Sequence, residues 1–145
     1  MPVEVTYQVP VDLPVNKIQQ ISETVFRGER FSWDKTVSFV FVDLGLMTEI
    51  NESYFNRNES TDVISFLYND DLSTEESESP WGEIYICVDR AREQAIDYQV
   101  TLQNEMARLI IHGLLHLIGY TDETAENEQR MTELENRYLK QIDPV

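Results

Sequence analysis

The sequence predicts an α+β fold, in which a single domain over residues 1–145 has a mixed sheet of about four strands with about five helices packed on it. Two observations predict this class. Short segments of β-branched and aromatic residues occur among longer segments with helical spacing of apolar residues, in the order β-α-β-α-β-β-α-α-α. A chain of 145 residues also suits one core, and it shows neither an internal repeat nor an inter-domain linker.

The first part of the chain predicts two strands and two helices. Residues 3–9 alternate apolar and polar side chains and indicate a strand at an edge of the sheet. Apolar residues at helical spacing predict one helix over 15–27 and another over 44–55. Between them, the run 37–42 is almost continuously apolar, which is typical of a strand buried on both faces.

A hairpin is predicted in the middle of the chain. Residues 62–68 and 82–88 have the composition of strands, and we expect them to pair antiparallel. The segment between them, residues 69–80, carries five acidic residues and no basic one. We therefore expect a long acidic tip that is exposed to solvent.

Three helices are predicted to complete the fold. Asp89 is a good N-cap for a helix that runs to about Tyr98, and Thr101 can cap the next, which runs to about residue 118. The apolar face of this second helix is wide, so we expect it to be largely buried. The last helix is expected over residues 124–141.

The charge of the chain limits its partners. Eleven Lys and Arg residues stand against 27 Asp and Glu, for a formal net charge of −16. Tight non-specific binding of nucleic acid rests on Lys and Arg side chains that contact phosphates, and this composition argues against it. The charge favours basic partners, or contacts confined to a local positive patch.

The composition also predicts a cytoplasmic protein with no membrane partner. The longest apolar run is far shorter than the roughly 18–20 residues of a membrane span. Residues 1–7 have neither the basic nor the apolar region of a signal peptide. The single cysteine, Cys87, cannot form an internal disulfide.

Both histidines of the protein, His112 and His116, lie four residues apart in one apolar segment. Residues i and i+4 of a helix share a face, so two imidazoles at this spacing can bind one metal ion. Gly119 can end the helix in a left-handed turn and let the chain return Asp122 as a third ligand. Three protein ligands and one open position are typical of catalytic zinc sites, so we expect one at the end of this buried central helix.

The residue after His112 separates two kinds of zinc chemistry. Peptidases with the pattern His-Glu-x-x-His use the Glu as a general base. Here that position is Gly113, which argues against a peptidase and permits another element to approach the helix closely. Hydrolysis would then depend on a metal that lowers the pKa of its bound water, or on a base from elsewhere.

The segment 112–120, His-Gly-Leu-Leu-His-Leu-Ile-Gly-Tyr, resembles the signature of the YbeY family, the bacterial rRNA maturation factors. A Glu-rich helix with Met131 and Glu135 follows it, as in that family. Further segments that resemble the family are Asn51-x-x-Tyr54 with residues 61–66, and residues 82–86 with Asp89, Arg92, Glu93 and Ala95. The resemblance extends from about residue 37 to about residue 140.

The resemblance implies a metal-dependent endoribonuclease specific for single strands, which acts in 16S rRNA 3′-end maturation and in ribosome quality control. It implies one Zn²⁺ bound through three residues of the signature, two of which are His112 and His116, with His112 also a catalytic residue. The partners that it implies are single-stranded RNA, namely small-subunit rRNA, and the ribosome or ribosomal proteins. DNA is not expected as a partner.

Two positions depart from the family pattern. Most members have His in place of Asp122, but zinc accepts carboxylate oxygen, and the added negative charge would also suit a harder divalent metal such as manganese. Phe55 stands where the family usually has an arginine that holds the RNA phosphate. Arg57, two residues on, or Arg108, one helical turn before His112, could take that role, and both remain candidate catalytic residues.

Two alternatives remain open at the level of sequence. The nucleophile of an RNA cleavage would be either a metal-activated water or the 2′-hydroxyl of the substrate, with the metal and a nearby Arg stabilising the developing charge. The second hypothesis is a non-catalytic ribosome assembly factor with a structural metal. Phe55 in place of arginine and the net charge of −16 support it.

Overall fold

The computed structural model describes residues 3–32, 34–56, 61–68 and 80–145. Its elements follow the order β1-α1-β2-α2-β3-β4-α3-α4-α5, and the strands form one mixed four-stranded sheet. The predicted α+β class and the predicted order of elements are therefore confirmed. Among the described residues, none of the helices has the length and apolar character of a membrane span.

The sheet consists of β1 (Val3–Tyr7), β2 (Val37–Val42), β3 (Val63–Leu67) and β4 (Gly82–Cys87). The strand order is β1-β2-β4-β3. β2 pairs in parallel with β1 and β4, whereas β3 and β4 form the predicted antiparallel hairpin. β1 lies at one edge, as predicted, and β3 lies at the other. Of the predicted acidic tip, residues 69–80, all but the last residue lie outside the described residues.

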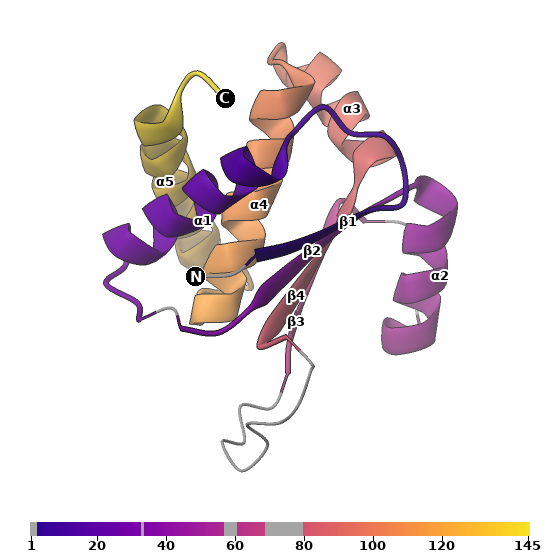
Figure 1. The fold of residues 1–145 in the computed structure, drawn as a ribbon, viewed down its shortest axis with the longest axis horizontal. Coiled ribbons are helices and arrows are strands. Elements are labelled where there is room, and N and C mark those ends of the chain that lie inside the picture. The colour runs from indigo at the N-terminus through magenta and orange to yellow at the C-terminus, as the bar shows by residue number, and fades with distance from the viewer. Residues whose placement is uncertain (1–2, 33, 57–60, 69–79) are drawn as a thin grey trace.

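The helices are α1 (Val15–Gly28), α2 (Leu44–Phe55), α3 (Val88–Tyr98), α4 (Leu102–Ile118) and α5 (Ala125–Ile142). α1, α4 and α5 lie together on one side of the sheet, and α2 lies on the other (Figure 1). α3 packs against α4 and leads from the end of β4 into the helical layer.

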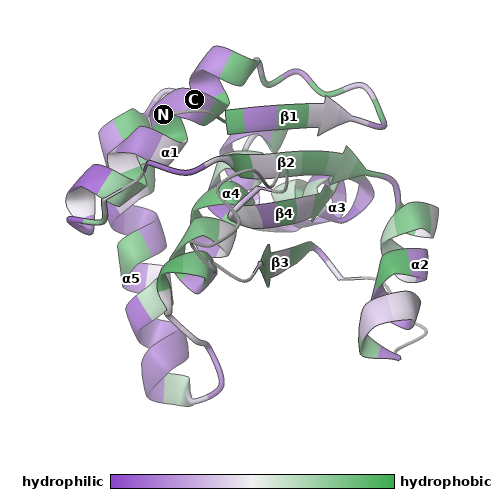
Figure 2. Ribbon diagram, turned by 60° about the horizontal axis from the view of Figure 1, so that its bottom comes forward, coloured by the Kyte–Doolittle hydropathy of each residue, from purple (hydrophilic) through white to green (hydrophobic). Residues whose placement is uncertain are grey.

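The two faces of the sheet bury separate clusters of side chains. All six residues of β2 are buried, which confirms the prediction of a strand enclosed on both faces. Phe39 and Phe41 point into the main cluster, which the helical layer covers. Val40 and Val42 belong to a smaller cluster with Met47 of α2. Figure 2 shows this distribution as a strongly hydrophobic β2 at the centre and hydrophilic stretches along α5.

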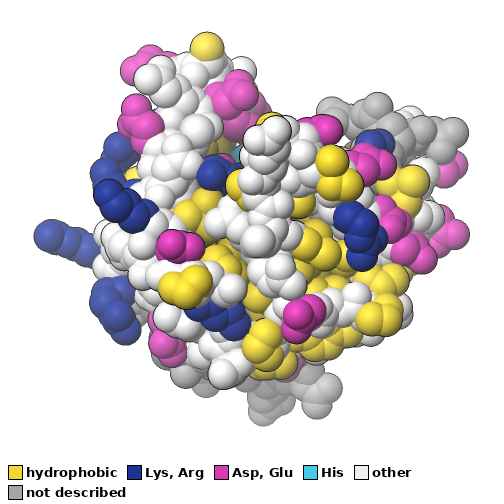
Figure 3. Space-filling model, turned by 90° about the horizontal axis from the view of Figure 1, so that it is seen from above, with side chains coloured by type: hydrophobic (Ala, Val, Ile, Leu, Met, Phe, Trp, Pro, Cys, Tyr) yellow, Lys and Arg dark blue, Asp and Glu magenta, His cyan; other side chains and the backbone are white. Residues whose placement is uncertain are grey.

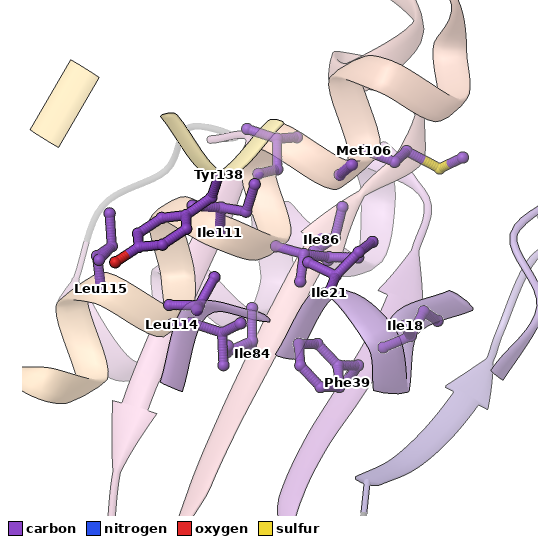
Figure 4. Close-up of a cluster of buried hydrophobic side chains, with 14 of the residues drawn as sticks. Ile18, Ile21, Phe39, Ile84, Ile86, Met106, Ile111, Leu114, Leu115 and Tyr138 are labelled. Atoms are coloured by element: carbon purple, nitrogen blue, oxygen red, sulfur yellow. The ribbon is translucent and has the colours of Figure 1, made fainter. Parts of the chain in front are cut away.

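α4 is the central helix of the main cluster. It contacts α1, α3, α5, β3 and β4, because apolar residues lie around most of its circumference. The close-up in Figure 4 shows residues of α4 meeting residues of the sheet, α1 and α5: Met106, Ile111, Leu114 and Leu115 with Ile18, Ile21, Phe39, Ile84, Ile86 and Tyr138. Each such side chain contributes about 1.5–3 kcal/mol on burial, so α4 is a rigid support for what its exposed end carries.

Two predicted helix caps have different outcomes. Thr101 caps α4 as predicted, because its Oγ1 accepts a hydrogen bond from the backbone N–H of Asn104 at 3.0 Å. The predicted cap of α3 is wrong, since α3 begins at Val88, one residue before Asp89. The Asp89 carboxylate instead accepts a hydrogen bond from the backbone N–H of Leu44 at 2.8 Å and so links α3 to the start of α2.

Candidate metal centre

The candidate centre lies at the C-terminal end of α4. The Nε2 atoms of His112 and His116 converge to 3.0 Å on one face of the helix. Gly119 ends α4 with a φ of 122°, which favours glycine, and the chain then turns back. Asp122 Oδ2 lies 3.6 Å from His112 Nε2 and 3.7 Å from His116 Nε2. The three predicted ligands thus come together, with their ligand atoms within 4.8 Å of one another, and could hold a metal ion.

The donor set fits a divalent transition metal. Imidazole nitrogen and carboxylate oxygen are both common ligands of Zn²⁺. The side chains of His112, His116 and Asp122 are 22, 30 and 44% exposed, so the group is accessible from one side. This partial exposure is typical of a catalytic site with an open position, whereas a structural site encloses its ion.

Glu135 of α5 orients the first histidine. Its Oε2 lies 2.6 Å from Nδ1 of His112, and its Oε1 lies 3.2 Å from Nη1 of Arg108. A carboxylate at Nδ1 holds the proton there and leaves the Nε2 lone pair free for a metal. The sequence pattern includes Glu135 among the residues that resemble the family but predicts no role for it. Its position could have indicated a buried role, because Glu135 lies on the buried stripe of α5 beside Leu134 and Tyr138.

The two imidazoles have different electrostatic environments. Burial lowers the pKa of His112, but the hydrogen bond and negative charge of Glu135 outweigh this effect, so the pKa is raised. Burial and the neighbouring His112 hold the pKa of His116 below its ordinary value. His116 is therefore neutral at pH 7, which is the state that binds metals.

A cavity of about 250 Å³ opens on one side of the centre and is lined by His112, Asp122 and Arg108 among others. The guanidinium of Arg108 donates to Glu135 and, from Nη2, to Oδ1 of Asn136 at 2.8 Å. Arg108 is thus held beside the centre by α5. The other candidate arginine, Arg57, lies outside the described residues.

A second cavity of about 660 Å³ opens on the other side of the centre. His116 and Asp122 line it together with Phe55, the last residue of α2. Asp122 lines both cavities, so the candidate centre lies between them. Phe55 therefore faces the approach to the candidate ligands His116 and Asp122.

Glu105 is a buried acid in the first cavity and is not among the candidate residues predicted from the sequence. It is 1% exposed, and its Oε1 has no hydrogen-bond partner among the described residues. Burial raises the pKa of Glu105 to about 7; Arg108 opposes the rise, and the negative charges of Asp62 and Glu135 add to it. A signal for Glu105 was its position on α4, seven residues before His112 and hence on a similar face.

We expect Glu105→Gln to stabilise the metal-free protein, and to do so by more at pH 8 than at pH 5.5. The folded protein keeps the Glu105 proton up to about pH 7, whereas an unfolded chain releases it near the ordinary value of 4.5. Wild type therefore loses stability as pH rises from about 4.5 to about 7, by about 3 kcal/mol in total, of which about 1.4 kcal/mol is already lost at pH 5.5, and the amide avoids this loss. Thermal unfolding with chelator at both pH values measures the difference.

Glu133→Gln is the control for this pH effect, because Glu133 lies on α5 and is 57% exposed. We expect it to show no pH-dependent gain. An equal gain for Glu105→Gln at pH 5.5 and pH 8 would contradict the raised pKa.

A second expected result concerns Glu135. Glu135→Gln removes the charge at His112 Nδ1, and such substitutions typically lower metal affinity about 10- to 100-fold. Competition for Zn²⁺ with a chromophoric chelator measures the loss. Glu128→Gln on the same helix makes the same charge change at the rim of the first cavity and should bind Zn²⁺ as wild type does. Equal affinities for the two variants would show that Glu135 does not support the centre.

The fold and this centre define an α+β protein with a group of two histidines and one aspartate at the end of its central helix that could hold a metal ion. The family described as Endoribonuclease YbeY matches residues 5–143, and this chain belongs to that family. The resemblance predicted from the sequence is therefore confirmed.

Two relatives show how far the similarity extends. Endoribonuclease YbeY of Chloroherpeton thalassium is 35% identical over 139 residues, which are 96% of this chain and 94% of the relative. Endoribonuclease YbeY of Acholeplasma laidlawii is 37% identical over 140 residues, 97% of each chain. A solution structure of a Thermotoga maritima protein is 23% identical, covers 97% of this chain and 89% of its own, and superposes with a TM-score of 0.68. This last likeness supports the fold alone.

Proposed function

We propose that this protein is a metal-dependent endoribonuclease that cleaves single-stranded RNA, with residues 1–145 as one catalytic domain. The observation that carries the proposal is the convergence of His112, His116 and Asp122 between two cavities, in a chain of the Endoribonuclease YbeY family. Its cellular role is 16S rRNA 3′-end maturation and ribosome quality control. Its partners are small-subunit rRNA and the ribosome or ribosomal proteins. The location is cytoplasmic, which agrees with a single, buried cysteine.

The ion that we propose is Zn²⁺, held by His112, His116 and Asp122. A divalent ion in such a site supplies Lewis-acid chemistry to a phosphodiester and to water. Glu135 keeps the Nδ1 proton of His112 and so presents Nε2 to the ion, while His116 is neutral and ready to bind. Asp122 adds a negative charge that a third histidine would not, which also suits a harder divalent metal.

Arg108 is the described arginine that we propose for phosphate charge. Its guanidinium lines the first cavity beside His112 and is fixed by Glu135 and Asn136. A fixed guanidinium beside a reacting phosphate stabilises charge that develops on it. Arg57 is the alternative for this role.

A non-catalytic ribosome assembly factor with a structural metal is the second candidate function. Phe55 in the position of the family's arginine and the net charge of −16 favour it, since both reduce the contacts available to RNA phosphates. The two candidates differ in whether RNA is cut, and this can be measured directly.

We expect wild type to cleave a labelled single-stranded RNA, to lose the activity with chelator, and to regain it when Zn²⁺ or Mn²⁺ is added back. Asp122→Ala should lose metal and activity together, because it removes one of three ligands. Asp122→His keeps a metal-binding side chain, so it should retain zinc and cleavage. Cleavage that persists in chelator would contradict the metal-dependent enzyme. Stoichiometric metal without any cleavage would support the assembly factor.

A further inference from the structure

The second cavity continues into a row of aromatic side chains. Phe55 of α2 stacks on Phe66 of β3, with ring centroids 5.9 Å apart and ring planes 16° apart. Phe66 in turn stacks on Tyr68, at 6.4 Å and 21°. The rings of Tyr54 and Tyr85 meet Phe66 edge to face at 5.1 and 5.7 Å. The row therefore runs from the cavity of the candidate metal centre onto the sheet face that carries α2.

Much of this row is exposed to solvent. Phe55 is 45% exposed, Tyr54 is 69% and Tyr68 is 39%. β3 pairs only with β4 among the described strands, so the row lies at an open edge of the sheet. Exposed aromatic side chains that cluster in this way mark a surface that binds a partner.

Charge decides which partner chemistry fits this surface. None of the described residues that line the second cavity is Lys or Arg. On the face shown in Figure 3, Lys and Arg side chains lie in several separate places, with Asp and Glu side chains between them. A chain with a net charge of −16 has few contacts for RNA phosphates. The flat faces of unpaired bases remain available, and aromatic rings bind them without regard to sequence.

We propose that Phe55, Phe66 and Tyr68 form a stacking platform for unpaired bases of single-stranded RNA, which leads the strand to the candidate metal centre. The inference rests on the proposed function and names how the substrate is held. His116 and Asp122 share a cavity with Phe55, so a base stacked on this ring places its neighbouring phosphate toward the metal ligands.

The test is RNA binding by metal-free protein, in which cleavage cannot interfere. A labelled single-stranded oligoribonucleotide is titrated in chelator with wild type, Phe55→Leu and Phe55→Trp, and binding is followed by fluorescence anisotropy. Loss of one stacked base corresponds to about 5- to 150-fold in affinity, and we expect this loss for Phe55→Leu, which keeps apolar volume without a ring. Phe55→Trp should bind as wild type, with indole emission quenched by RNA. Ile96→Ala, a change at a 74% exposed apolar residue of α3, is the control that should bind normally.

The second measurement uses an RNA strand in which one nucleotide is abasic. It should bind wild type as weakly as the intact strand binds Phe55→Leu, and the abasic change should have no further effect in Phe55→Leu. The slope of log affinity against log salt should be no steeper than about −1.4, the value for two phosphate contacts on a single strand. Equal affinities of wild type and Phe55→Leu, or a much steeper slope, would overturn the platform.

Cleavage by the metal-loaded wild type separates this inference from the proposed function. Normal cleavage and normal RNA affinity of Phe55→Leu would overturn the platform and leave the enzyme standing. Phe55-dependent RNA binding without cleavage would support the platform and overturn the enzyme. A change in sedimentation but not in RNA affinity on Phe55→Leu would assign the surface to a second copy of this chain and overturn the inference.

Discussion

Replacing His116 by alanine is expected to remove the bound metal and all RNA cleavage while the fold stays intact. Among the described residues, His116 supplies one of three converging ligand atoms, so its loss leaves two. Its side chain is 30% exposed at the end of α4, outside the buried cluster, and alanine has the highest helix propensity. Metal analysis, cleavage of labelled single-stranded RNA and thermal unfolding of the same preparation measure the three outcomes.

Glu123→Ala is the matched control for His116→Ala. It removes an exposed side chain next to Asp122 that is not part of the ligand group, and it should keep both metal and activity. Equal trace activity in wild type and His116→Ala would point to a contaminating nuclease, and the assembly-factor function would gain support.

Gly113→Glu would give the chain the His-Glu-x-x-His pattern, yet we expect it to unfold the protein instead of creating a peptidase. A Cβ atom at Gly113 would lie 2.8 Å from Cγ2 of Ile84 and 3.1 Å from Oγ of Ser65. A side chain at this position therefore points into the sheet and away from the metal ligands. Overpacking typically costs about 1–3 kcal/mol, and a buried unpaired carboxylate costs several more, against a total stability of about 5–15 kcal/mol.

Gly113→Ala isolates the steric part of this effect. It adds the Cβ atom without the charge, so we expect a loss of about 1–3 kcal/mol with the fold retained. Urea unfolding of wild type and both variants gives the comparison. A stable, folded Gly113→Glu protein would show that β3 and β4 do not pack on α4 as described. The close approach is also visible in the hydrogen bond from Ser65 Oγ to the Gly113 carbonyl at 3.1 Å.

The elements of the fold could be predicted because their apolar periods are local properties of the sequence. β2 and α2 have the bounds that their periodicity indicates, residues 37–42 and 44–55. The start of α3 could not be predicted in this way. Asp89 is a good cap by its residue type, but its carboxylate binds the backbone of Leu44, 45 residues away, and this contact exists only in the folded chain.

The residues of the candidate site also differ in whether local sequence is enough to predict their roles. His112, His116 and Asp122 lie within 11 residues of one another, so helix geometry and one glycine turn suffice to bring them together. Glu135 and Phe55 reach the centre from other elements, and their roles depend on how α5 and α2 pack. Residue type alone does not identify these two residues, because one glutamate of a Glu-rich helix and one phenylalanine are common in any sequence.

Because Glu135 of α5 contacts His112 of α4, the metal affinity of the centre depends on how α5 packs on α4. The hydroxyl of Tyr138 on α5 donates a hydrogen bond to Glu29, which follows α1. Tyr120, in the loop before Asp122, donates to the same carboxylate at 2.5 Å. Any change that separates α5 from α4 therefore withdraws the carboxylate from His112 and also opens the main cluster, to which α5 contributes Met131, Leu134 and Tyr138. The metal affinity of the centre therefore reports whether the last helix is docked on α4.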